Sequence, residues 1–201
     1  MDILVIAVIV AIAALALRRQ QERQRIVLLA SYLGPFQIEK LMATLSEGYL
    51  RALDENDPQR QQQVWDHLRN SELALCDQFE QFATRFASAS AEQTRVSRLA
   101  WAIPWADRLF AAASFDARKA IAIHAQGIRR AVHADPAASS KSRAYTLCAE
   151  MFLMQHTCHW FCKSKAVASA RVWVRHQTRY AQVLDAVTPA TAQAYKALVT
   201  T

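Results

Sequence analysis

Glycine is scarce in this sequence, and its scarcity excludes several classes of protein. The 201 residues include only Gly34, Gly48 and Gly127. Loops that hold phosphate groups need several glycines, because backbone amides must approach the anion closely. The sequence accordingly has no P-loop and no dinucleotide-binding fingerprint. Hairpin turns also favour glycine, so we expect few strands.

The sequence also lacks a local signature of catalysis. It contains no recognisable pair of carboxylates, no nucleophile beside its base and no metal-site helix of known spacing. We therefore expect a protein that acts by binding, is not an enzyme and needs no cofactor. A catalytic set that is brought together only by folding is the alternative.

Charge is distributed unevenly along the chain. Hydrophobic residues make up 53%, which excludes a disordered chain, and the net charge is +7. Residues 26–90 carry five basic and nine acidic side chains, whereas residues 91–201 carry fifteen basic and six acidic ones. The two halves can pack together. Alternatively, the basic half exposes a face to anionic lipid or to nucleic acid.

Residues 3–17 form an uninterrupted apolar run, ILVIAVIVAIAALAL. As a helix this run is about 22 Å long, shorter than the hydrocarbon core of a bilayer, which is about 30 Å thick. Arg18 and Arg19 follow at once, and such side chains reach the headgroups from a short helix. We expect residues 1–25 to form a transmembrane anchor in contact with membrane lipid, and residues 26–201 to form the folded domain.

The charges around the run predict its orientation. Asp2 precedes it, whereas Arg18, Arg19, Arg23 and Arg25 follow it. Positive charge marks the cytoplasmic side, so we expect the N-terminus outside and the domain in the cytoplasm. Arginine outnumbers lysine eighteen to six, which suggests a bacterial protein and hence the inner membrane. The alternative is a signal peptide whose cleavage leaves the domain in the periplasm.

Breakers and periodicity predict an all-α bundle of six to seven helices after the anchor. Gly34-Pro35 ends the first helix, and Asp57-Pro58 supplies the cap and the first-turn proline of the third. The second helix between them has an inward face at Ile38, Leu41, Leu45, Tyr49 and Ala52.

The third helix carries an apolar seam with steps of three and four residues. Its members are Trp65, Leu68, Glu72, Leu75, Phe79, Phe82 and Phe86. Such a seam is typical of a helix packed inside a bundle. The alternative is a docking surface for a partner protein, formed by Trp65, Glu72 and Phe79, with Glu72 selecting the partner.

A fourth helix is predicted after Ser90 and Gln93, which resemble a capping box. Its inward positions are Val96, Leu99, Ile103, Ala106 and Phe110, and Pro104 should kink it. Trp101 and Trp105 would stack four residues apart on another face. We expect them to lie in the core, with the membrane interface as the alternative.

Ser114 should cap a fifth helix, in which His124 lies on the apolar face as a core histidine. Two segments at 143–163 and 166–187 have no breaker between them, so they form either two helices or one rod. Thr188-Pro189 begins a final short helix.

Sulfur and imidazole gather on one face of the segment from Cys148 to Cys162. Cys158, His159 and Cys162 are spaced to meet one soft ion such as Zn²⁺ or Cu⁺. Their segment is apolar on nearly every side, however, which is typical of a central helix. Buried cysteine packs as a small hydrophobe. We expect core packing, with a metal or thiol sensor as the alternative.

Arg171, Arg175 and Arg179 are spaced four residues apart and predict a straight basic ridge. Val167, Ala170, Val174, Ala181 and Leu184 should face the core behind it. The ridge is interpreted as a solvated face, with anionic lipid or nucleic acid as alternative ligands.

Together these patterns predict a membrane-anchored helical bundle that recruits a protein partner, as a scaffold or an accessory subunit.

Overall fold

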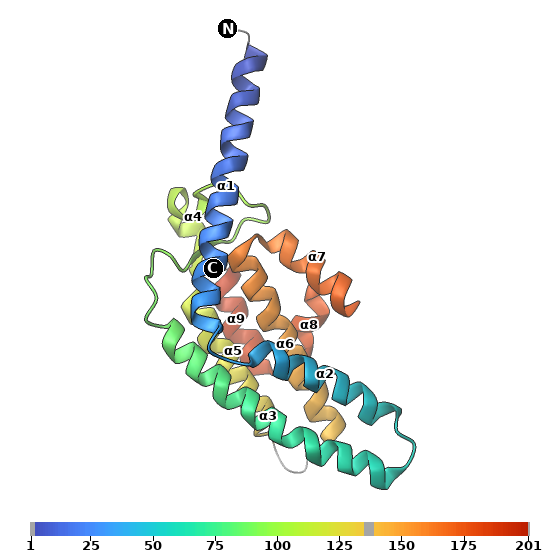
Figure 1. Cartoon of the computed structure of the whole chain (residues 1–201). Helices are drawn as coiled ribbons and strands as arrows, with labels where there is room; N and C mark the ends of the chain where they lie inside the picture. The colour runs from blue at the N-terminus through green and yellow to red at the C-terminus, as the bar shows by residue number, and fades with distance from the viewer. Residues whose placement is uncertain (1–2, 135–138, 201) are drawn as a thin grey trace.

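The computed structural model describes residues 3–134 and 139–200, so Asp2 lies outside the described residues. Within these ranges the chain folds into an all-α bundle of nine helices, with one short two-stranded sheet (Figure 1). The fold class expected from the sequence is thereby confirmed.

The first helix, α1 (Ile3–Leu33), projects from the bundle along its apolar half. It is the one helix in the described chain that is long and apolar enough to cross a membrane, and its composition is equally consistent with a signal sequence. Its other end joins the bundle, where Leu29 is buried and the ring of Tyr32 meets Phe86 edge-on. The helix ends at Gly34, as predicted.

Helices α2 (Ile38–Asp54) and α3 (Pro58–Phe86) form a hairpin. The Asp57 side chain accepts hydrogen bonds from the backbone amides of Gln59 and Arg60, which confirms the predicted cap. All seven seam residues of α3 are buried in the bundle. On α2 four of the five predicted inward residues are buried, whereas the fifth, Leu41, is half-buried and Met42 is buried in its place.

The predicted fourth helix is wrong. The chain instead forms strand β1 (Arg95–Ser97), helix α4 (Ala106–Leu109), a turn of 3-10 helix, η1 (Ala111–Ala113), and strand β2 (Ser114–Asp116). The two strands pair antiparallel, with Val96 opposite Phe115. Trp105 has a left-handed backbone (φ 58°), which a continuous helix cannot contain. The next helix, α5 (Ala117–Val132), is capped by Asp116 and not by Ser114.

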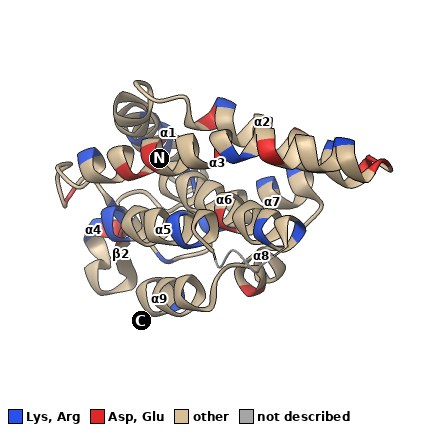
Figure 2. Ribbon diagram, turned by 90° about the horizontal axis from the view of Figure 1, so that it is seen from below, with Lys and Arg blue, Asp and Glu red and all other residues tan. Residues whose placement is uncertain are grey.

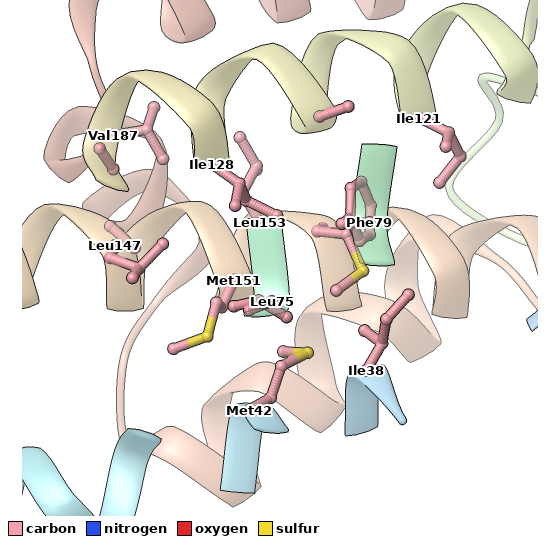
Figure 3. Close-up of a cluster of buried hydrophobic side chains, with 14 of the residues drawn as sticks. Ile38, Met42, Leu75, Phe79, Ile121, Ile128, Leu147, Met151, Leu153 and Val187 are labelled. Carbon is pink, nitrogen blue, oxygen red and sulfur yellow. The ribbon is translucent and has the colours of Figure 1, made fainter. Parts of the chain in front are cut away.

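Helix α6 (Ser140–Cys162) lies at the centre of the bundle. It packs against α5, and α9 (Pro189–Thr200) packs against α5 and reaches α6 through Tyr195. Figure 3 shows side chains of α5, α6 and α3 meeting those of α2 in one core, which includes Phe79, Ile128 and Met151. A central apolar helix was expected here, and its apolar character on every side is explained by these neighbours.

The segment at 166–187 is two helices, α7 (Lys165–His176) and α8 (Tyr180–Ala186), and neither continues α6. Ser164 caps α7 with its side chain, and a left-handed Gln177 ends it. The expected core face is therefore wrong at three of its five positions: Val174 is 72% exposed, and Ala170 and Ala181 are exposed. Leu184 is buried as expected, and Ala168, Val172 and Val183 are buried in place of the other positions.

Candidate partner-binding groove

The three proposed metal ligands lie on α6, near its C-terminal end. The Cys158 Sγ donates to Met154 Sδ at 3.6 Å, and the Nδ1 of His159 lies 3.0 Å from a guanidinium nitrogen of Arg171. Within residues 3–134 and 139–200, no group of three or more His, Cys, Asp or Glu side chains is placed to hold a metal ion. In this geometry His159 faces an arginine rather than the two thiols.

Burial suppresses the reactivity of the cysteines on α6. It raises the pKa of Cys162 to about 11 and that of Cys148 to about 12, and it raises the pKa of Cys158 above its ordinary value. Thiolates are the species that attack electrophiles and bind metals. At neutral pH these side chains are therefore neutral thiols that pack beside apolar groups.

The three candidate docking residues of α3 lie inside the bundle. Trp65, Glu72 and Phe79 are each less than 7% exposed. The Glu72 carboxylate accepts hydrogen bonds from the Tyr49 hydroxyl at 2.8 Å and from the guanidinium of Arg69 at 2.9 Å, and Arg143 approaches it at 3.2 Å. Two arginines thus compensate one buried carboxylate, which joins α2, α3 and α6 internally.

The basic ridge is divided between two helices. Arg171 and Arg175 stand on the exposed face of α7, but Arg179 follows the turn at Gln177 and precedes α8. Its guanidinium lies 5.8 Å from the ring centroid of Trp173, within range of a cation–π contact. The structure therefore does not form the straight row of three arginines that the spacing predicted.

Arg171 and Arg175 border a groove that no local motif indicated. We use "the α6 groove" for two adjoining hollows of about 570 and 950 Å³, which share Ser46, Arg175 and His176. One wall is α2 and the other is α7 with α8, while α6 forms the floor. Toward α1 the groove reaches Ile26 and Leu29, and at its far end it reaches Tyr145.

The floor of the α6 groove is lined by apolar side chains and by cysteine thiols. It includes Cys148, Phe152 and Cys158, all half-buried. Phe152 stacks on the His176 ring, with centroids 3.7 Å apart. Large apolar side chains on the rim are open to solvent, namely Leu50, Leu53 and Tyr145. An exposed apolar groove with polar edges is typical of a binding surface.

The walls of the groove differ in charge. The α7 wall presents Arg171 and Arg175 and no carboxylate, whereas the α2 wall presents Glu39 and Glu47. Figure 2 shows this contrast, with blue residues on α7 and both colours on α2. Burial, and after it the charges of Arg171 and Arg175, lower the pKa of His159, so this ring is neutral beside them.

A cluster of buried polar side chains lies in the interior of the bundle, away from the α6 groove. His124, which the sequence placed in the core, is fully buried, and its Nε2 lies 2.8 Å from the Thr157 hydroxyl. That hydroxyl also meets the Tyr195 hydroxyl at 2.8 Å. Nearby, the Nε2 of His156 lies 3.0 Å from the Ser169 hydroxyl. Burial lowers the pKa of each imidazole to about 3, so both are neutral hydrogen-bonding groups of the core.

Comparison of the chain with protein-family models, with curated proteins and with solved structures found no match.

Proposed function

We propose that this protein is a membrane-anchored adapter that binds an amphipathic helix of a partner protein in the α6 groove. The observation that carries the proposal is the incomplete cover of α6. This helix is apolar on nearly every side and is covered by α5, α7 and α8, yet Cys148, Phe152 and Cys158 remain half-buried along the groove. An apolar helical face laid against them would complete the cover.

The dimensions of the groove fit a helix. The α2 wall has 17 residues, which corresponds to a length of about 25 Å and to a bound helix of about five turns. Small side chains at the floor and rim, Ser46, Ala144 and Ala149, allow a helical backbone to approach closely. The rim leucines and Tyr145 would then contact the apolar stripe of the ligand.

The charges favour a ligand with carboxylates on one edge. Arg171 and Arg175 would pair with acidic side chains of the bound helix along the α7 wall, while Glu39 and Glu47 would disfavour acidic groups along the α2 wall. Such complementary charges set the direction of the bound helix and raise the rate of association more than the affinity.

The anchor belongs to the same proposal. Residues 3–17 of α1 are exposed over nearly their whole length and are apolar throughout, as a segment in contact with lipid would be. Arg19 and Arg23 are exposed beyond them, and Asp2 precedes them in the sequence. We place the N-terminus outside the cytoplasmic membrane and the bundle in the cytoplasm, where a bound partner would be held at the membrane surface.

Photo-crosslinking in cells tests the groove. Benzoylphenylalanine at position 145, on the rim, should form adducts with one partner protein, and the crosslinked segment should be an amphipathic helix with acidic residues on one edge. The matched control is position 126, which is exposed on α5 and borders neither hollow. Equal adducts at both positions, or adducts with lipid alone, would contradict the proposal.

A peptide with the crosslinked sequence then tests the charges. It should bind the full-length chain in detergent, and the Arg171→Glu, Arg175→Glu double variant should weaken binding about tenfold or more. Lys119→Glu changes an exposed charge on α5 and should leave binding unchanged. Equal affinity of the double variant and the wild type would remove the charge argument.

A further inference from the structure

The segment between the two strands carries large apolar side chains on its surface. We call residues 99–113 "the β1–β2 excursion"; it contains α4 and η1. Trp101 is 74% exposed and Leu109 is 68% exposed. Ile103, Trp105 and Phe110 are each at least 45% exposed. Five such side chains on fifteen residues form an apolar patch that no part of the described chain covers.

The excursion is fixed against α1 by a buried polar cluster. Gln21 donates to the Asp107 carboxylate at 2.8 Å and accepts from the backbone amide of Trp105 at 3.2 Å. The Arg25 guanidinium pairs with the other Asp107 oxygen at 3.3 Å and donates to the backbone carbonyl of Arg95 at 2.9 Å. Asp107 is only 5% exposed. These bonds hold the left-handed Trp105 in place, a conformation that costs free energy outside glycine.

The position of the cluster along α1 sets the height of the patch. Gln21 follows Leu17, the last residue of the apolar run, by four residues, which is about 6 Å along the helix axis. The headgroup layer on each side of a bilayer is about 5–8 Å thick. Figure 1 shows α4 and its flanking loops beside α1 where the helix leaves the bundle, on the side toward its N-terminus. If residues 3–17 lie in hydrocarbon, the excursion lies at the headgroups.

We propose that the β1–β2 excursion inserts its apolar side chains into the headgroup region of the bilayer that α1 crosses. Two of the five are tryptophans, and indole rings favour this layer because they combine an apolar body with a polar N–H. Arg108 lies within the excursion, exposed and paired with the exposed Glu92 at 3.1 Å, and it would meet lipid phosphates there. The contact would make the bundle rigid relative to the membrane and fix the direction in which the α6 groove opens.

This proposal rests on the proposed membrane anchoring, so the experiment measures the two separately. The full-length chain is mixed with vesicles in detergent, and the detergent is then removed. Flotation with the vesicles reports the anchor. Quenching of tryptophan fluorescence by brominated acyl chains, relative to unbrominated ones, reports the excursion. Trp65 and Trp160 are buried, and Trp173 is exposed on α7, eight residues beyond the end that adjoins the excursion.

The expected signal follows from the five tryptophans of the chain. If Trp101 and Trp105 alone contact lipid and all five emit equally, brominated lipid should remove about two fifths of the wild-type emission. The Trp101→Phe, Trp105→Phe double variant should float equally well and lose almost all of this quenching. The matched control, Trp173→Phe, should lose about half of its emission, because two of its four remaining tryptophans are quenched.

Three outcomes would overturn the proposal. A chain that floats but shows no quenching has its anchor in the bilayer and its excursion in water. Quenching that persists in the double variant comes from other tryptophans. A chain that does not float refutes the anchor, and with it the excursion's contact. All substituted tryptophans are exposed, so the variants should fold, and the unchanged emission of Trp65 and Trp160 checks this.

Discussion

Mild acid should destabilise this protein, because two histidines are buried in their neutral form. His124 is fully buried and His156 is 1% exposed, and burial lowers the pKa of each to about 3. Lys165 lowers the pKa of His156 further by repulsion. In the unfolded chain both imidazoles titrate near pH 6.5. Between pH 6.5 and 3 the unfolded chain therefore binds more protons than the folded one, and stability falls as the pH falls.

The magnitude follows from linkage. Well below pH 6.5, each such histidine costs about 1.4 kcal/mol of stability per pH unit. From pH 7.5 to pH 5 the loss is about 2 kcal/mol for each residue and about 4 kcal/mol for both. Single domains are stable by about 5–15 kcal/mol in total, so the effect is large. His159 and His176, whose pKa values are also lowered by burial, act in the same direction. Glu150, whose pKa is raised by burial, opposes them.

Urea unfolding of the full-length chain in mild detergent, at pH 7.5 and pH 5 and constant ionic strength, measures the loss. His124→Gln and His156→Gln keep a hydrogen-bonding side chain that does not titrate. Each variant should reduce the acid-induced loss by about 2 kcal/mol, whatever its stability at pH 7.5. Glu150 contributes equally to the acid-induced losses of the wild type and of each variant, so its contribution cancels when these two losses are compared. His67→Gln, at an exposed position of α3, is the control. If both buried-site variants lose as much stability as the wild type, the two imidazoles are not neutral in the fold.

Three further predictions concern the core, the anchor and the thiols. Phe79→Ala should reduce the free energy of unfolding by about 3–5 kcal/mol in the same urea assay, because this ring is fully buried; an unchanged value would place the seam outside the core. Residues beyond Arg25 should resist protease added outside intact cells, and moving the four arginines ahead of Ile3 should weaken or invert this protection; digestion of the wild type from outside would refute the orientation. The four cysteines should resist alkylation until urea is added; for Cys158 and Cys162, elemental analysis beside the double alanine variant gives a second check, since one equivalent of zinc or copper in the wild type alone would favour the sensor alternative.

The early helices could be predicted because their boundaries depend on local chemistry. Gly34 ends α1, and the Asp57 carboxylate caps α3 through the amides two and three residues ahead of it. The seam of α3 was found for the same reason, since steps of three and four place its members on one face whatever they touch. Helix caps, helix-ending residues and apolar spacing each depend on residues within about four positions of one another, so they can be identified in the sequence.

The division between α7 and α8 could not be predicted in this way. No proline or glycine separates the segments, and the break depends on Gln177 in a left-handed conformation that glycine or asparagine more often adopts. The core face assigned to one long helix therefore failed on both sides of the break, since Val174 and Ala181 are exposed, although Leu184 is buried. The shift also moved Arg179 away from Arg171 and Arg175, which left these two on the wall of the groove.

The α6 groove could not be predicted from the sequence for a different reason. Its lining comes from six helices, and the pairs that meet there are far apart in sequence, such as Ser46 and His176. The one trace of it in the sequence is the apolar character of residues 148–162 on every side. A helix of that kind must be covered on every side, and its pattern does not say whether the cover belongs to the same chain.

The β1–β2 excursion shows why apolar periodicity alone could not place the tryptophans. Val96, Leu99, Ile103, Ala106 and Phe110 have helical spacing, yet Val96 and Ala106 are buried while Ile103 and Phe110 face outward. The spacing of apolar residues indicates which side chains avoid water. It does not indicate whether protein or lipid surrounds them instead. The conformation of the excursion depends on Gln21 and Arg25, which lie more than 65 residues away in the sequence and fix the excursion through Asp107. Since α1 carries these two residues just beyond its apolar run, the contacts that replace the predicted helix also hold the exposed side chains close to the end of that run, where we propose that the headgroups lie. The same apolar residues thus fit poorly in a core helix and well in a membrane contact.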